Sequence, residues 1–144
     1  MLLVLALIGI SAPVEAQTGC TLTQGFWKTH PEAWGVTGLM LGGAAYTQDQ
    51  LITILSTPPR GDATYILAKQ LIAAELNLFN GADGSISQVI TAADSWLGLN
   101  PLGSWPRGAA REEGLQLASQ LDAFNNGLSG VPHCEGELPP PPQD

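Results

Sequence analysis

ATYILAKQLIAAELNLFN, residues 63–80, is the stretch that decides the fold. Asp62 stands directly before it, at the position of a helix N-cap, and Gly81 follows it, where glycine commonly ends a helix. The apolar residues of this segment cover most of a helix circumference: Ile66, Leu67, Leu71, Ile72, Leu76, Leu78 and Phe79. A helix that is apolar on nearly every side belongs in the centre of a fold. We therefore expect the other elements to pack around it.

One short helix is predicted near the N-terminus of this domain. Thr21 and Gln24 have the spacing of a capping box, which predicts a helix that runs to about His30. Pro31 ends that helix, because the residue before a proline avoids the α region. Pro31 is also suited to open a further turn through Trp34.

A hairpin and a second helix are expected before the central segment. Two adjacent glycines stand between the apolar residues 39–41 and 44–46, which predicts a small hairpin. Thr47 and Gln50 form another capping box, so a helix through Ser56 should follow. Its inner face is expected to hold Leu51, Ile52 and Leu55.

Two helices are predicted after the central one. Ser85 is expected to cap the first of them. Its apolar residues follow the helical period: Ile86, Val89, Ile90, Ala93 and Leu97. The last helix should run from about Ala109 to Asn125 and end at residues 126–127. Its inward residues are Leu117, Ala118, Leu121 and Phe124. These segments predict an all-α, single-domain bundle of four to five helices with one tiny hairpin.

The N-terminal residues have the pattern of a secretory signal peptide. An unbroken apolar run, residues 2–10, is followed by a break at residues 11–13 and by small residues around Ala16. The run is about half of the ~20 residues that a membrane-spanning helix needs, although a membrane anchor is the alternative. We expect cleavage that leaves a helical Cys-to-Cys domain, residues 17–134, and a proline-rich tail, residues 135–144. The protein should then be secreted or held at the cell surface.

Cys20 and Cys134 are the only cysteines, and they stand at the two ends of the mature domain. Two thiols that are exported to an oxidising compartment usually pair. Such a bridge would clamp the ends of the bundle and stabilise it by roughly 4–5 kcal/mol in the chain-entropy model. The alternative is a pair of metal ligands, although neither cysteine belongs to a CxxC motif.

The charge balance excludes several classes of partner. The chain has 5 Lys and Arg against 13 Asp and Glu, a net charge of −8. An acidic chain does not follow a phosphate backbone, so we expect no nucleic acid, and no membrane after signal cleavage. Charged residues are only 12% of the chain, about half of the usual share. Such a surface favours association with itself or with another surface or matrix protein, through the apolar loops at residues 39–41 and 99–105.

Residues 25–34, GFWKTHPEAW, form the segment richest in aromatic residues. One interpretation is a small core in which Trp27 and Trp34 are buried and Lys28 lies over a ring. The other is an exposed aromatic platform that stacks on carbohydrate or on a partner protein. The binding residues would then be Phe26, Trp27, Lys28, His30, Glu32 and Trp34.

Few residues are candidates for catalysis or metal binding. His30, Glu32 and His133 are the only ones, HPE is not the HExxH zinc motif, and no third ligand is evident. No GxSxG, GxGxxG or P-loop motif is present, and the bridge would leave no free cysteine. We therefore predict no metal, no cofactor and no catalytic residue.

The pattern C…TQGFWKxHPEAW…NNG…PHC begins at Cys20 and ends at Cys134. It resembles a largely uncharacterised module of secreted and surface proteins of bacteria. The segment from residues 58–62, PPRGD, to residues 70–74, QLIAA, is similar to the same module. The resemblance implies export and a Cys-to-Cys unit, and it names no catalytic residue.

These observations favour a non-enzymatic extracellular protein that is structural, adhesive or self-assembling. A second hypothesis is a module that binds carbohydrate or a small ligand through the region of Trp27 and Trp34. A third is a small metal-dependent hydrolase built around His30 and Glu32. Exposure of the two tryptophans separates the first hypothesis from the second.

Overall fold

The computed structural model describes residues 18–134. The expected signal peptide, residues 1–16, and the expected proline-rich tail, residues 135–144, lie outside the described residues. The helices are α1 (Gln24–Thr29), α2 (Gln48–Ser56), α3 (Ala63–Phe79), α4 (Ser87–Leu99) and α5 (Gly108–Asn125), with two 3-10 turns, η1 (Pro31–Ala33) and η2 (Gly84–Ile86). The strands are β1 (Gly38–Leu41) and β2 (Ala44–Thr47). The described chain is therefore mostly helical, and the small hairpin is present beside the helices.

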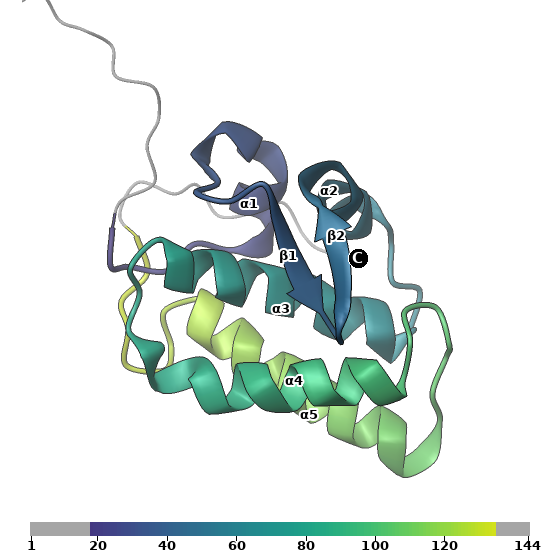
Figure 1. The fold of residues 1–144 in the computed structure, drawn as a ribbon. Coiled ribbons are helices and arrows are strands. Elements are labelled where there is room, and N and C mark those ends of the chain that lie inside the picture. The colour runs from purple at the N-terminus through teal and green to yellow at the C-terminus, as the bar shows by residue number, and fades with distance from the viewer. Residues whose placement is uncertain (1–17, 135–144) are drawn as a thin grey trace, which may run out of the picture.

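The central helix is the predicted one. α3 packs against α1, α2, α4, α5 and β1 (Figure 1). The side chain of Asp62 caps it by accepting a hydrogen bond from the Thr64 backbone N–H at 3.0 Å. Gly81 has a φ of +88°, and this left-handed conformation ends the helix as expected. Leu67, Leu71 and Ile72 are fully buried on α3, which confirms its central position.

α4 and α5 lie side by side along one side of α3 (Figure 1). The four inward residues predicted for α5 are all buried, and four of the five predicted for α4 are buried while Val89 is half-buried. Gly114 lets the two helices approach, because a Cβ at that position would overlap the Trp96 ring. The Trp96 indole also donates to the Ala110 carbonyl at 2.9 Å, so this ring fastens α4 to α5.

The hairpin leads into α2 and leans across α3 toward α4. β1 and β2 are antiparallel, with Leu39 opposite Tyr46 and Met40 opposite Ala45. Thr47 and Gln50 form the predicted capping box of α2. One residue differs from the prediction, since Ile54 rather than Ile52 joins Leu51 and Leu55 in the core: Leu51, Ile54 and Leu55 are buried, and Ile52 is half-buried.

The predicted N-cap of the first helix is wrong. α1 is capped by Thr23, whose hydroxyl accepts from the Phe26 N–H, and not by Thr21. Thr21 is held extended by distant residues instead: its N–H donates to the Pro132 carbonyl at 2.9 Å, and its carbonyl accepts from the Cys134 N–H at 2.9 Å. These two tertiary hydrogen bonds exclude a helical start at Thr21.

The predicted cap of the fourth helix is also wrong. Asp83 caps the short turn η2 by accepting from the Ser85 N–H at 2.8 Å. Ser85 therefore lies inside that turn, and α4 begins two residues later at Ser87. A carboxylate accepts a hydrogen bond from a backbone N–H more strongly than a hydroxyl does, which explains why Asp83 takes this role.

Cys20 and Cys134 form a disulfide between residues 114 positions apart. The predicted bridge is thus confirmed, and the alternative of a cysteine metal site is wrong. A parallel bridge between Thr21 and His133 continues the link next to it. Together these contacts bring the two ends of the described chain to one place.

Candidate functional site

Trp27 and Trp34 are buried, with exposed fractions of 1% and 9%. The Trp34 indole donates to the Trp27 carbonyl at 2.8 Å. These positions confirm the predicted burial of Trp27 and Trp34 and contradict an exposed platform built on the two tryptophans. The ring contacts found in residues 18–134 belong to Phe26, which meets the edge of Trp27 and stacks on His30, and not to Lys28.

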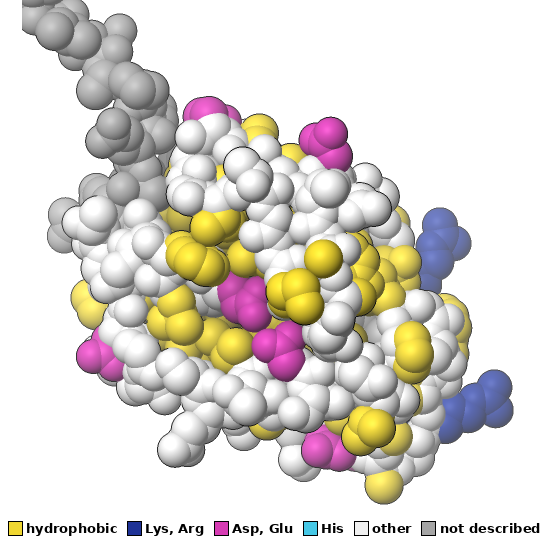
Figure 2. Space-filling model, viewed as in Figure 1, with side chains coloured by type: hydrophobic (Ala, Val, Ile, Leu, Met, Phe, Trp, Pro, Cys, Tyr) yellow, Lys and Arg dark blue, Asp and Glu magenta, His cyan; other side chains and the backbone are white. Residues whose placement is uncertain are grey.

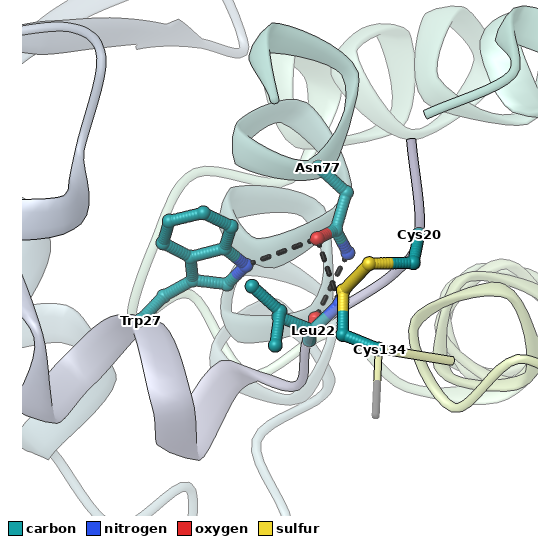
Figure 3. Close-up of a disulfide and its surroundings, with 5 residues drawn as sticks. All are labelled: Cys20, Leu22, Trp27, Asn77 and Cys134. Atoms are coloured by element: carbon teal, nitrogen blue, oxygen red, sulfur yellow. Dashed lines mark hydrogen bonds between the residues drawn. A yellow bond between two sulfur atoms is a disulfide. The ribbon is translucent and has the colours of Figure 1, made fainter. Parts of the chain in front are cut away.

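Asn77 explains why the tryptophan segment is held so firmly (Figure 3). Its Oδ1 accepts from the Trp27 indole at 3.2 Å and from the Leu22 N–H at 2.9 Å. Its Nδ2 donates to the Leu22 carbonyl and to Asn125 Oδ1, both at 2.9 Å. Asn77 thus joins α1, α5 and the chain beside the disulfide to α3. This part of the sequence pattern serves the fold.

His30 and Glu32, two of the three candidate residues, pair with each other. His30 Nδ1 lies 2.9 Å from Glu32 Oε1, and this hydrogen bond lowers the pKa of Glu32. His30 also forms the C-terminal cap of α1, while His133 lies at the other end of the chain, paired with Thr21. Within residues 18–134, no three His, Cys, Asp or Glu side chains are placed to hold a metal ion.

A hollow lies between the hairpin, α3 and α4. It is a groove of about 760 Å³, and most of its walls are apolar. Figure 2 shows yellow side chains around acidic ones at the centre of this face. The lining residues are Thr37, Gly38, Leu39, Met40, Ala45, Tyr46, Glu75, Leu78, Phe79, Ile90 and Asp94.

Glu75 is the unusual residue of this groove. Burial, together with the nearby charge of Asp94, raises the pKa of Glu75 to about 8. Its Oε2 is buried and has no hydrogen-bond partner among the described residues. A buried polar atom without a partner costs free energy. The groove wall therefore contains a carboxyl group that is mostly neutral at pH 7 and has one oxygen without a hydrogen-bond partner among the described residues.

Asp94 is the second carboxyl group of the groove, and its position is fixed. Its Oδ1 accepts a hydrogen bond from the Gly42 N–H at 3.1 Å. Gly42 has a φ of +58° in the hairpin turn, and a Cβ there would come within 2.9 Å of the Leu97 backbone. Asp94 thus ties the hairpin to α4 at one end of the groove lining.

Reasoning from the sequence missed this groove. One indication of the groove is present in the sequence of the central helix. Within residues 63–80, Lys69 and Glu75 are the only charged residues. The groove itself arises from the hairpin, which covers α3 and α4 only after the chain has folded. No spacing along the chain indicates that Glu75 would meet Asp94.

The expected apolar surface is partly present. The side chains of Leu39 and Leu41 on β1 are buried in the core, so Met40 is the exposed residue of the segment 39–41. The second loop matches the expectation better, because Leu99 and Trp105 are exposed. Between residues 18 and 134, no helix combines the length and the apolar character that crossing a bilayer requires.

Comparisons of this chain with protein-family models, with curated proteins and with solved structures find no match.

Proposed function

We propose that this chain is a non-enzymatic extracellular binding module whose groove holds a small molecule with an apolar body and a basic amine. The observation that carries the proposal is Glu75, which lines an apolar groove and has a buried Oε2 without a hydrogen-bond partner among the described residues. Small-molecule sites combine apolar walls with a few polar groups that set orientation.

Charge complementarity selects the amine. Glu75 and Asp94 both line the groove, and none of the described residues that line it is basic. An ammonium group would give Glu75 the partner that it lacks and would stabilise its ionised form. The net charge of −8 attracts cations to the molecule before they reach the groove.

Two aromatic rings support the same ligand class. Tyr46 lies on the hairpin wall and Phe79 lies at the exposed rim where α3 ends. The face of an aromatic ring attracts a cation, and aromatic side chains recognise ammonium ligands in this way. Carbohydrate is a weaker candidate, because it would need more hydrogen-bonding groups than this apolar lining offers.

The extracellular and non-enzymatic parts of the proposal rest on other features. The disulfide between Cys20 and Cys134 is typical of exported domains. The paired residues His30 and Glu32 lie on the surface outside the groove.

Binding of hexylamine tests the proposal, with hexanol as the uncharged probe of the same length. We expect hexylamine to bind more tightly, and Glu75→Gln to remove its advantage over hexanol. Affinity for the amine should rise as the pH approaches the Glu75 pKa of about 8, because binding then releases fewer protons. Glu113→Gln is the matched control, since it removes one exposed acid of α5.

Three outcomes would contradict the proposal: equal affinity for both probes, no saturable binding of either, or an amine preference that survives in Glu75→Gln. Calorimetry in two buffers of different ionisation enthalpy adds an independent measure, because binding to neutral Glu75 must release a proton.

Self-association is a second candidate, favoured by one observation. Leu99 is 84% exposed, and Trp105 and Leu128 are also large exposed apolar side chains. Sedimentation of the wild type and of Leu99→Ser over a concentration series tests it. A concentration-dependent mass that falls in the variant supports assembly, and a constant monomer mass for both contradicts it.

A further inference from the structure

A second pocket, separate from the groove, lies where the start of α1 meets the turn before α3. Its volume is about 290 Å³, and it shares no lining residue with the groove. The lining residues are Gln24, Pro59, Arg60, Gly61, Ile66, Lys69 and Gln70. The pocket is thus bordered by basic and amide side chains together with two apolar ones.

Lys69 lines this pocket although it is a buried residue. Only 7% of Lys69 is exposed, and lysine is rarely so buried unless it is paired. Across residues 18–134, the one ion pair within 4.0 Å joins His30 to Glu32, so Lys69 has no carboxylate partner there. A buried lysine keeps its carbon chain in the core and its ammonium group near the surface, so a partner for the Lys69 ammonium group would have to come from the pocket.

Two further cations lie near Lys69. Arg60 lines the same pocket, and Lys28 stands one turn after Gln24 on α1, close enough for its charge to act on Lys69. Burial and that like charge both lower the pKa of Lys69. Three of the chain's 5 basic residues therefore gather here, in a protein with 13 acidic ones. Without an anion, this arrangement is electrostatically unfavourable.

The turn before α3 brings Arg60 to the pocket in an unusual conformation. Arg60 has a φ of +51° and is followed by Gly61 at +87°. Non-glycine residues seldom adopt positive φ, and such positions are frequent at ligand sites. The Asp62 N–H closes the turn on the Pro59 carbonyl at 2.9 Å.

The amide groups and the apolar walls indicate which anion fits. The Gln24 side chain has no hydrogen-bond partner among residues 18–134, so its amide N–H can donate to a ligand in the pocket. Gln70 is already engaged, because it donates to Asp122 Oδ1 at 3.1 Å and accepts from Asn125. Pro59 and Ile66 provide an apolar side for a short carbon chain.

We propose that this pocket binds a small organic carboxylate, with its oxygens on Lys69 and Arg60 and its carbon chain against Pro59 and Ile66. Lys28 adds attraction from the side of α1. The volume of about 290 Å³ admits only a small ligand. Because the rest of the molecule is acidic, the site is suited to one local anion and not to a long polyanion.

Titration with sodium propionate at constant ionic strength tests this inference, with NMR detection of the Lys69 side chain and of nearby amides. We expect saturable shifts, a rise in the pKa of Lys69 on binding, and weaker binding of inorganic phosphate. Lys69→Met keeps the buried stem and removes the charge. It should weaken propionate binding by at least about tenfold, the loss expected for one charge-assisted hydrogen bond.

Arg60→Gln should also weaken binding, whereas Arg107→Gln should leave it unchanged. Arg107 is an exposed cation just before α5, and it lies outside the pocket. Arg107→Gln and Arg60→Gln each remove one positive charge, so the two variants have the same net charge. Thermal unfolding and circular dichroism show whether each variant is folded. Shifts that do not saturate, equal weakening in all three variants, or binding of phosphate without propionate would each overturn the proposal.

Discussion

The Trp27 indole donates a hydrogen bond to Asn77 Oδ1, 50 residues further along the chain, at 3.2 Å. Asn77 is fully buried, and its carboxamide also bonds both backbone groups of Leu22 and the side chain of Asn125. One side chain thus uses all of its donors and acceptors. It holds together segments that come from three parts of the sequence.

Asn77→Ala should destabilise the fold strongly. The substitution leaves buried groups of Trp27, Leu22 and Asn125 without partners, and each such group costs about 1–3 kcal/mol. We expect the free energy of unfolding to fall by at least about 3 kcal/mol in a urea titration. Gln116→Ala, at an exposed position of α5, should change it by less than about 0.5 kcal/mol. Similar values for both variants would contradict the network.

Removal of the disulfide should also be costly. The bridge closes a chain of 114 residues, for which the chain-entropy model gives about 4–5 kcal/mol. The variant Cys20→Ala with Cys134→Ala should lose much of that stability in denaturant titrations. Wild-type protein purified without reducing agent should weigh less than its reduced form by two hydrogen atoms. Free thiols in that protein would contradict the bridge.

Asp62→Ala should cost about 1–2 kcal/mol through loss of the N-cap of α3. The Thr64 hydroxyl donates to Asp62 Oδ1 at 2.8 Å and accepts from the Gly103 N–H at 2.9 Å. The variant should therefore also speed hydrogen exchange at Gly103. Asp62→Asn keeps the acceptor oxygen and should cost much less. An unchanged exchange rate at Gly103 in Asp62→Ala would show that Thr64 holds that loop without Asp62.

Glu75 should make stability fall as the pH rises. Its pKa is about 8 in the folded protein and 4.5 in the unfolded chain, so between these values the native state holds a proton that the unfolded state has released. Unfolding is then favoured by increasing pH, with a slope of at most about 1.4 kcal/mol per unit. The effect should level off above pH 8.

Glu75→Gln should remove this slope and raise stability near neutral pH, because it replaces a carboxyl group that resists ionisation with a neutral amide. Glu113→Gln should keep the slope, since Glu113 is exposed on α5. Urea titrations at a series of pH values measure both variants. A wild type whose stability is flat between pH 4.5 and about 8 would contradict the raised pKa.

Features that depend on neighbouring residues could be predicted from the sequence. Local hydrogen-bond patterns define the capping box of Thr47 and Gln50 and the two ends of α3. The sequence predicts both features correctly. Thr21 was misplaced because its backbone is bound by residues near Cys134, which local spacing does not reveal. The tryptophans posed the same difficulty, since their burial depends on Asn77 and on the packing of α3.

The candidate sites were harder to predict than the helices. Glu75 and Lys69 are ordinary residues for an exposed helix position, and only their location in an all-round apolar helix sets them apart. Each becomes a candidate site residue through partners from other elements: the hairpin and α4 for Glu75, and α1 and the turn at Arg60 for Lys69. Only the tertiary fold brings these residues and their partners together.

The bridge at the ends of the domain has a mechanical consequence. The Cα atoms of Cys20 and Cys134 are 4.9 Å apart, so the chain enters and leaves the domain at nearly the same point. Tension applied to the chain outside these two residues passes through the covalent bond and bypasses the helices between them. A pull on the two ends should therefore leave the groove and the second pocket unchanged. Under tension, the chain between Cys20 and Cys134 would remain a closed and folded loop.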